Sequence, residues 1–149
     1  NAIAKRRVVR KIETTSDLAE LIAQLVGRGK QKIHPATKVF QALRMEVNRE
    51  IDALESGLEA AWRGLKPGGR LAVITFHSLE DRMVKDFGRT LERDYIAPGE
   101  VDVPELRQPK EPEAEIITRK PIVAGDEEVC ENPRARSAKL RVLEKKGSA

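Results

Sequence analysis

Residues 65–82, LKPGGRLAVITFHSLEDR, form the stretch that decides the fold. Residues 66–69, KPGG, combine a proline with a glycine pair and therefore end a preceding helix. The run 71–76, LAVITF, is almost entirely apolar and contains β-branched residues, which predicts a strand buried on both faces, as in a parallel sheet. Ser78 and Asp81 follow at the spacing of a helix-capping pair. The stretch therefore predicts a turn, a buried strand and a helix in immediate succession.

The residues before this stretch show the periodicity of amphipathic helices. Apolar side chains recur every three or four positions from Ala36 to Leu65, and Pro35 suits the first turn of a helix. We predict a single long helix here, bent near Gly57. A shorter amphipathic helix precedes it, and Gly27 and Gly29 end that helix.

The residues after the stretch combine a helix with a loop and short strands. Apolar spacing predicts a helix over 78–91, and residues 94–113, which hold four of the eight prolines, predict a long loop. Residues 115–118 and 138–143 predict two strands, and the connection between them favours antiparallel neighbours over a βαβ unit. The order of helices and strands makes the fold class α/β, with half of a doubly wound sheet.

The composition limits the classes of protein and partner. The chain has 149 residues, 40% hydrophobic and 35% charged, which is typical of one globular domain, alone or with an appendage. The net charge of +4 permits a nucleic-acid partner without requiring one, because 24 acidic residues accompany 28 basic ones. Aromatic residues make up only 3%, which argues against a row of exposed rings that stack on bases.

Cysteine use and hydropathy narrow the setting further. Cys130 is the only cysteine, so no internal disulfide can form and a cysteine-based metal site is disfavoured. No apolar run approaches the roughly 18 residues that span a membrane, and the basic N-terminus lacks the apolar segment of a signal peptide. These observations predict a cytoplasmic protein with no metal site and no membrane partner.

Three stretches of the sequence resemble a single family. They are residues 34–48 (HPATKVFQALRMEVN), residues 65–82 as quoted, and residues 132–141 (NPRARSAKLR). Together they resemble the C-terminal half of the bacterial 16S rRNA cytidine-N4 methyltransferases, also called MraW or RsmH, and the resemblance covers residues 3–145. It implies the C-terminal part of a Rossmann-like, class I methyltransferase fold, in which a helical domain is inserted after the fourth strand.

The resemblance also implies a division of the chain. Residues 3–33 correspond to the tail of the helical insertion, and residues 34–149 to the C-terminal part of the methyltransferase domain, with an antiparallel final strand. The family's donor-binding loop lies upstream, in an N-terminal half without a counterpart here. The glycine pair at 68–69 does not replace that loop, because it precedes a strand instead of joining a strand to a helix. We expect this fragment alone neither to hold a cofactor nor to catalyse, and to form a homodimer through an exposed apolar sheet edge.

The activity that the resemblance implies is methyl transfer from S-adenosylmethionine to the exocyclic N4 of a cytidine in the decoding region of 16S rRNA, in the small ribosomal subunit. The nitrogen lone pair is delocalised into the ring, so the enzyme mainly supplies alignment and electrostatics, without a metal. The base has to be exposed or extruded to reach the pocket. The alternative is a non-catalytic RNA-binding or oligomerisation module with the same half-fold.

The turn after the predicted strand supplies the candidate catalytic residues. Ligands of open α/β sheets bind beyond the carboxyl ends of the strands, which places Phe76, His77 and Ser78 at the mouth of the site. One hypothesis is that His77 and Ser78 contact the target nucleotide, with Phe76 packing beside it. The alternative is that Ser78 only caps the following helix and that His77 is only a packed turn residue. Glu80 and Asp81 are interpreted as first-turn helix residues and not as catalytic bases.

Two further groups of polar residues are candidates for RNA binding. Arg44 and Asn48 lie four positions apart, hence on one face of a helix and off its apolar stripe. They either contact RNA or fasten the helical insertion to the sheet. Arg134, Arg136 and Lys139 form the densest basic cluster near the C-terminus, where phosphate contact competes with ion pairing to the acidic stretch just before them.

Overall fold

The computed structural model describes residues 2–27, 34–99 and 101–147. The chain divides into two compact units, Asn1–Ile51 and Asp52–Ala149, which are described separately below. The domain boundary predicted between residues 33 and 34 adjoins residues 28–33, which lie outside the described residues, and it stays a prediction.

The first unit consists of helices α1 (Ala2–Val9), α2 (Thr15–Val26) and α3 (Thr37–Val47). Thr14 and Asp17 cap the start of α2 reciprocally: the Thr14 hydroxyl accepts from the Asp17 N–H at 3.1 Å, and the Asp17 carboxylate accepts from the Thr14 N–H at 3.1 Å. The helix ends at Gly27, as predicted, with a positive φ of 75°. A small core of buried apolar residues and their partly buried neighbours holds the unit together: Leu18, Ile22, Ala36, Ile3, Ile12, Ala19, Val39 and Phe40.

The single long helix predicted after Pro35 is wrong. The segment forms two helices, α3 and α4 (Glu50–Gly64), which are separated at Asn48 and Arg49. Arg49 has a φ of 51°, in the left-handed region that ends an α-helix, whereas Gly57 lies within α4. The apolar spacing continues through the break, so periodicity alone gave no sign of it.

The second unit is mixed α/β. After α4 its elements are, in order, β1 (Arg70–Thr75), α5 (Ser78–Glu92), β2 (Tyr95–Ile96), η1 (Pro104–Leu106), β3 (Gln108–Pro109), β4 (Ala114–Ile116), β5 (Ile122–Val123), α6 (Asp126–Glu131), η2 (Pro133–Ser137) and β6 (Lys139–Lys145). The main sheet has the order β1-β6-β4, and β5 also pairs with β6. Every pairing with β6 is antiparallel, which confirms the antiparallel arrangement predicted for the last two strands.

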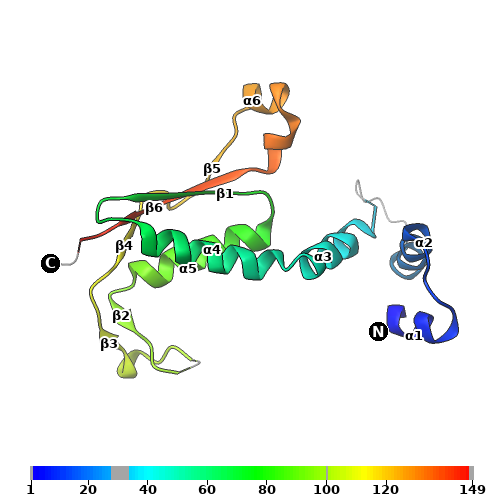
Figure 1. Cartoon of the computed structure of the whole chain (residues 1–149), viewed down its shortest axis with the longest axis horizontal. Coiled ribbons are helices and arrows are strands. Elements are labelled where there is room, and N and C mark those ends of the chain that lie inside the picture. The colour runs from blue at the N-terminus through cyan, green and yellow to red at the C-terminus, as the bar shows by residue number, and fades with distance from the viewer. Residues whose placement is uncertain (1, 28–33, 100, 148–149) are drawn as a thin grey trace. The chain divides into compact units, whose positions relative to one another are not determined.

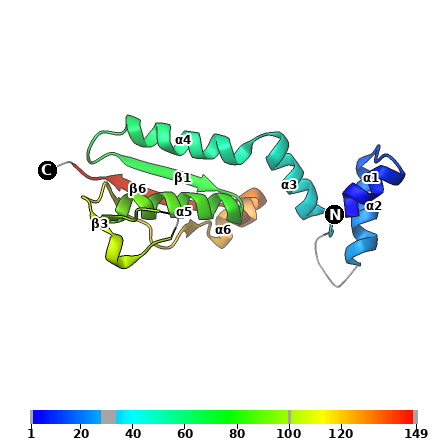
Figure 2. The ribbon, with the colours of Figure 1, turned by 90° about the horizontal axis from the view of Figure 1, so that it is seen from below.

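Helices α4 and α5 lie on the same face of this sheet (Figures 1 and 2). The Trp62 and Phe87 rings, one from each helix, meet edge to face with centroids 6.3 Å apart. Leu143 of β6 packs beneath Gly88 of α5, where an added Cβ would lie 2.7 Å from a Leu143 methyl carbon. The core therefore depends on close contact between α5 and the central strand, and the absence of a Cβ at Gly88 leaves room for the Leu143 side chain.

The opposite face of β1 differs from the prediction. The expected strand was buried on both faces, but only alternate side chains are covered, and Ile74 keeps 60% of its surface exposed. The reason is that the described residues place both α4 and α5 on one side of the sheet (Figure 1). Within the described residues, only one face of the apolar run 71–76 is therefore covered by helices.

The loop predicted over 94–113 contains a short antiparallel ribbon, β2–β3. The Tyr95 hydroxyl donates to Asp102 at 2.9 Å, and the Arg107 guanidinium lies over the Tyr95 ring at 4.1 Å. Arg107 also donates to Asp102 at 2.8 Å. These contacts give the proline-rich segment a defined structure that its composition did not predict.

Candidate nucleic-acid interface at the end of strand β1

The turn between β1 and α5 begins directly after Thr75, which is buried at the carboxyl end of the strand. Phe76 keeps 56% of its surface exposed, and Ser78 is also exposed. The Ser78 hydroxyl has no hydrogen-bond partner among the residues that the structure describes. The turn therefore presents an aromatic ring and a hydroxyl to solvent on either side of His77.

The cap of α5 is His77, so the prediction that Ser78 caps this helix is wrong. His77 Nδ1 accepts a hydrogen bond from the Glu80 N–H at 3.4 Å. In return, the Glu80 carboxylate accepts from the N–H groups of Phe76, at 2.8 Å, and His77, at 3.2 Å. An imidazole nitrogen supplies the acceptor that a Ser hydroxyl usually provides, and Ser78 becomes the first residue of the helix.

The tautomer of His77 follows from this cap. Since Nδ1 accepts a hydrogen bond, the proton of the neutral ring resides on Nε2. Nε2 is buried and lies 3.1 Å from Glu80 Oε1, but its N–H is not directed for a hydrogen bond. Nδ1 is therefore engaged by the cap, and Nε2 is the ring nitrogen without a hydrogen-bond partner among the described residues.

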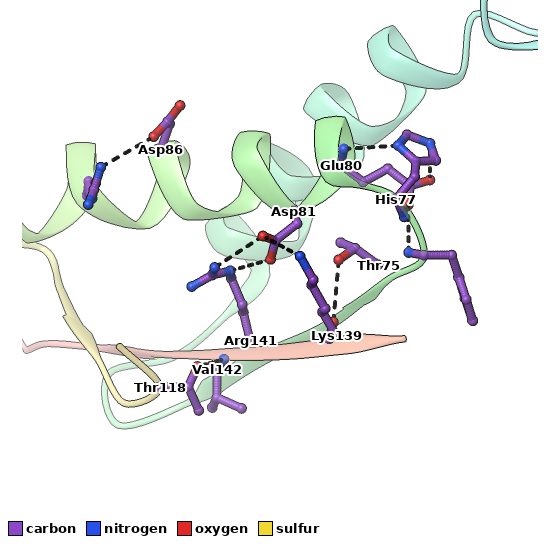
Figure 3. Close-up of polar contacts among 11 residues, drawn as sticks. Thr75, His77, Glu80, Asp81, Asp86, Thr118, Lys139, Arg141 and Val142 are labelled. Atoms are coloured by element: carbon purple, nitrogen blue, oxygen red, sulfur yellow. Dashed lines mark hydrogen bonds and ion pairs between the residues drawn. The ribbon is translucent and has the colours of Figure 1, made fainter. Parts of the chain in front are cut away.

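A second anchor of the turn is an ion-pair cluster on the first turn of α5. The Asp81 carboxylate accepts from Arg141 Nε at 2.7 Å and Nη2 at 3.3 Å, and from Lys139 Nζ at 3.4 Å (Figure 3). The hydrogen bond from Arg141 holds the pKa of Asp81 below its ordinary value, and this effect outweighs the burial that raises it. The side chains of Asp81 and Arg141 are only 14% and 8% exposed.

This cluster fixes α5 against the sheet at the end where the turn lies. Arg141 and Lys139 belong to β6, and Lys139 is the register partner of Thr75. The Thr75 hydroxyl also donates to the Lys139 carbonyl at 3.4 Å. Helix, strand end and central strand are thus joined within a few residues of His77, which gives the turn a rigid base.

The predicted basic cluster is divided by the structure. Lys139 is engaged with Asp81, whereas Arg134 and Arg136 lie exposed on η2. Within the described part of the chain neither arginine forms an ion pair, so the predicted competition from the acidic stretch before them is absent there. Because η2 leads directly into β6, both arginines are at the end of the sheet where β1 ends.

Arg44 and Asn48 are engaged within the first unit. Arg44 donates to the Glu50 carboxylate at 2.8 and 3.0 Å, and Asn48 Nδ2 donates to it at 3.2 Å. These contacts span the break between α3 and α4. The structure therefore gives both residues a local role at this break.

The most important residues that sequence analysis missed are Glu80 and Arg141. Glu80 lies three positions after His77, which is the capping-box spacing, but a histidine cap is uncommon and the pattern was assigned to Ser78. Arg141 occupies an inward position of β6, between Lys139 and Leu143. An arginine at an inward strand position signals a buried carboxylate partner, although nothing in the sequence indicates that the partner is Asp81.

Other classes of site find no support in the part of the chain that is described. No group of three or more His, Cys, Asp or Glu side chains is arranged to hold a metal ion there. No described helix is long and apolar enough to cross a membrane. Cys130 is free and exposed.

Comparison with known proteins agrees with the family indicated by the sequence motifs. Residues 1–146 match the profile of the MraW methylase family. A "Ribosomal RNA small subunit methyltransferase H" of Bradyrhizobium diazoefficiens is 49% identical over 144 residues, covering 97% of this chain and 43% of the relative. Proteins of the same name from Carboxydothermus hydrogenoformans (97% and 46% covered) and Geobacter sulfurreducens (96% and 46%) are each 50% identical. The chain thus spans less than half the length of these relatives, and it belongs to the MraW methylase family.

Proposed function

We propose that the complete gene product that contains this chain transfers a methyl group from S-adenosylmethionine to N4 of a cytidine in the decoding region of 16S rRNA, and that it acts in the cytoplasm on the small ribosomal subunit. The chain contributes the wall of the active site that faces the nucleotide. Membership of the MraW methylase family, together with relatives named as small-subunit rRNA methyltransferases, is the observation that carries this proposal.

The strand arrangement supports a Rossmann-like, class I methyltransferase fold. β6, the last strand, lies between β1 and β4 and runs antiparallel to both. β1 and β4 therefore run parallel to each other. This matches the antiparallel final strand implied by the family resemblance, with β1 in the place of the fifth strand.

The described residues do not fit the methyl donor by themselves. The N–H of Gly68 is bonded to the Lys145 carbonyl at 2.8 Å, and the Gly69 carbonyl accepts from the Lys145 N–H at 2.9 Å, so the glycine pair joins β1 to β6. In the turn between β1 and α5, the Glu80 carboxylate occupies two backbone N–H groups. The N–H groups of the glycine pair are thus engaged within the fold and are not free to hold a cofactor, so the roles proposed for this chain's residues concern the acceptor nucleotide.

Each residue of the turn has a separate role in the proposal. Ser78, whose hydroxyl does not cap the helix, hydrogen-bonds the target nucleotide, and the exposed Phe76 ring packs beside the extruded base. His77 holds the turn through its Nδ1 cap, and Nε2 is the ring nitrogen that remains for a contact with the nucleotide. Arg134, Arg136 and Lys139 supply positive charge beside this turn for the RNA backbone. Arg44 and Asn48 remain candidates for RNA contact from the first unit.

The test is methyl transfer by the complete gene product to small-subunit RNA, followed by mapping of the modified base. N4-methylcytidine in the decoding region is the expected product. Replacing Ser78 by Ala is expected to reduce kcat/KM by about 10-fold while leaving the unfolding midpoint unchanged, because the hydroxyl makes no contact in the fold. RNA that is bound but never methylated would instead favour a non-catalytic RNA-binding module.

A further inference from the structure

The pocket beside the second half of α5 is a separate feature from the turn at residues 76–78. It is lined by α5, by β4 and the residues that follow it, and by β6: Val84, Lys85, Arg89, Glu92, Ile116, Thr118, Arg119, Arg141 and Leu143. Four of these residues are cationic and one is acidic. All belong to the second compact unit.

The cations of this pocket are only partly neutralised. Lys85 is half-buried and forms no ion pair with any residue that the structure describes. Arg89 lies 3.9 Å from Asp86, and both side chains are more than half exposed. Arg119 pairs with Glu92 at 3.2 Å, but its side chain is 77% exposed. Exposed pairs of this kind are weak and exchange easily with another anion.

The Arg141 guanidinium lines the pocket and is held in one position. Asp81 holds its Nε and Nη2 atoms, and the side chain is 8% exposed, so its guanidinium cannot swing away (Figure 3). Along β6, Arg141 lies two residues after Lys139 and two residues before the apolar Leu143. A guanidinium in a fixed position, together with further Lys and Arg side chains in the lining, suits a small oxyanion that stays charged at every physiological pH.

We propose that this pocket binds a backbone phosphate of the RNA substrate. A phosphodiester is the fitting ligand because the lining offers cationic donors and the Thr118 side chain but no exposed aromatic ring to stack on a base. Lys85 is seven residues after Ser78, about 10 Å along the axis of α5. The pocket therefore grips the RNA strand a short distance from the nucleotide held at the turn, and fixes its register. The inference rests on the proposed function, because it takes RNA to be the substrate.

The experiment measures binding of the complete gene product to a synthetic RNA that covers the decoding region, over a series of salt concentrations. The variants are Lys85→Ala, Arg89→Ala and the double variant, and the control is Arg63→Ala, which removes an equal charge from an exposed position on α4. Each lost phosphate contact is expected to lower the slope of log affinity against log salt by about 0.7–0.9. The control is expected to retain the full slope, and thermal unfolding checks that every variant is folded.

The outcomes separate this inference from the proposed function. If the double variant keeps the affinity and salt slope of the unchanged protein, the phosphate site is refuted, even where methyl transfer to RNA is observed. If methyl transfer is absent but the slope falls in the double variant, the phosphate site stands and the proposed activity fails. Inorganic phosphate serves as the competing probe. Displacement of RNA by millimolar phosphate from the unchanged protein, with equal displacement from the double variant, would also refute the site.

Discussion

Asp81 and Arg141, which are 60 residues apart in the sequence, form a hydrogen-bonded ion pair at 2.7 Å that ties the first turn of α5 to the central strand β6. The pair lies one helical turn from His77, so the geometry of the candidate site depends on it. Both side chains are largely buried, whereas those of the Arg89–Asp86 pair on the same helix are more than half exposed.

Breaking this pair is expected to destabilise the protein. Asp81→Asn removes the carboxylate and leaves the buried Arg141 charge uncompensated, a change that typically costs about 3–5 kcal/mol. Asp86→Asn on the same helix is the control, since its partner Arg89 is exposed and 3.9 Å away, and it is expected to cost at most about 1 kcal/mol. Urea unfolding measures both. Equal losses of unfolding free energy in the two variants would mean that the Asp81–Arg141 pair contributes no more stability than the exposed Asp86–Arg89 pair.

The same pair predicts how stability depends on pH. The pKa of Asp81 is lower in the folded protein than its ordinary value of 3.8, because Arg141 favours the ionised carboxylate. The folded state therefore binds this proton less readily than the unfolded state, and the stabilisation is complete above about pH 5. It is lost as the pH falls below 3.8 towards the folded pKa. Urea midpoints of the unchanged protein and Asp81→Asn should differ by a constant amount above about pH 5 and approach each other in acid. A difference that does not narrow as the pH falls below 3.8 contradicts this assignment.

Two substitutions of His77 separate its structural role from contact with the nucleotide. Asn retains a side-chain acceptor for the Glu80 N–H, whereas Ala removes it and is expected to cost about 1 kcal/mol of folding stability. Neither variant retains Nε2. We expect His77→Asn to fold normally and to show lower kcat/KM with small-subunit RNA. Full activity in this variant would mean that His77 acts only as the helix cap.

Gly88 and Gly57 are expected to respond to alanine in opposite directions. A Cβ at position 88 would lie 2.7 Å from a Leu143 methyl carbon, and such overpacking typically costs about 1–3 kcal/mol. A Cβ at position 57 meets no atom within 4 Å, and the residue is inside α4, so Gly57→Ala is expected to stabilise by about 0.5–1 kcal/mol. Thermal or urea unfolding of the two variants tests this pair of predictions.

The outer edge of β1 predicts self-association of the 149-residue chain. Within the described residues β1 pairs only with β6, and Ile74 beside this edge is 60% exposed. An unpaired strand edge next to an apolar face favours pairing with a second copy. Light scattering is expected to show a dimer whose fraction rises with concentration and falls in Ile74→Lys. A monomer at all concentrations would contradict the proposed homodimer.

Helices and strands whose own residues show a clear apolar period lie close to the bounds expected from the sequence. Features that leave this period unchanged, or that depend on pairing with a distant strand, were missed. The strand at 71–76, the following helix and the final strand were predicted well, because each has its own apolar period and nearby turn residues. The break at Asn48–Arg49 was missed, since a single left-handed residue leaves the apolar spacing intact. The strand β5 was missed as well, because its two residues form a strand only through pairing with β6.

The candidate site shows the same division. The sequence motifs placed His77 and Ser78 at the end of β1, but they assigned the cap to the wrong one of the two. A cap is selected by which side chain reaches the N–H groups, and in this turn the Nδ1 atom of His77 reaches the Glu80 N–H. Lys139 is paired with Asp81, a partner on another element that the sequence did not indicate.

The amino-acid sequence by itself determined the family, the α/β class and the position of the turn at residues 76–78, because long motifs and apolar periodicity are properties of neighbouring residues. Only the tertiary structure decided which side of the run 71–76 is covered and which charged groups meet. The order β1-β6-β4 brings Arg141 to Asp81 and leaves Arg134 and Arg136 exposed. Electrostatic pairing depends on distances in space, and those distances exist only once the strands have paired in register and α5 has packed upon them.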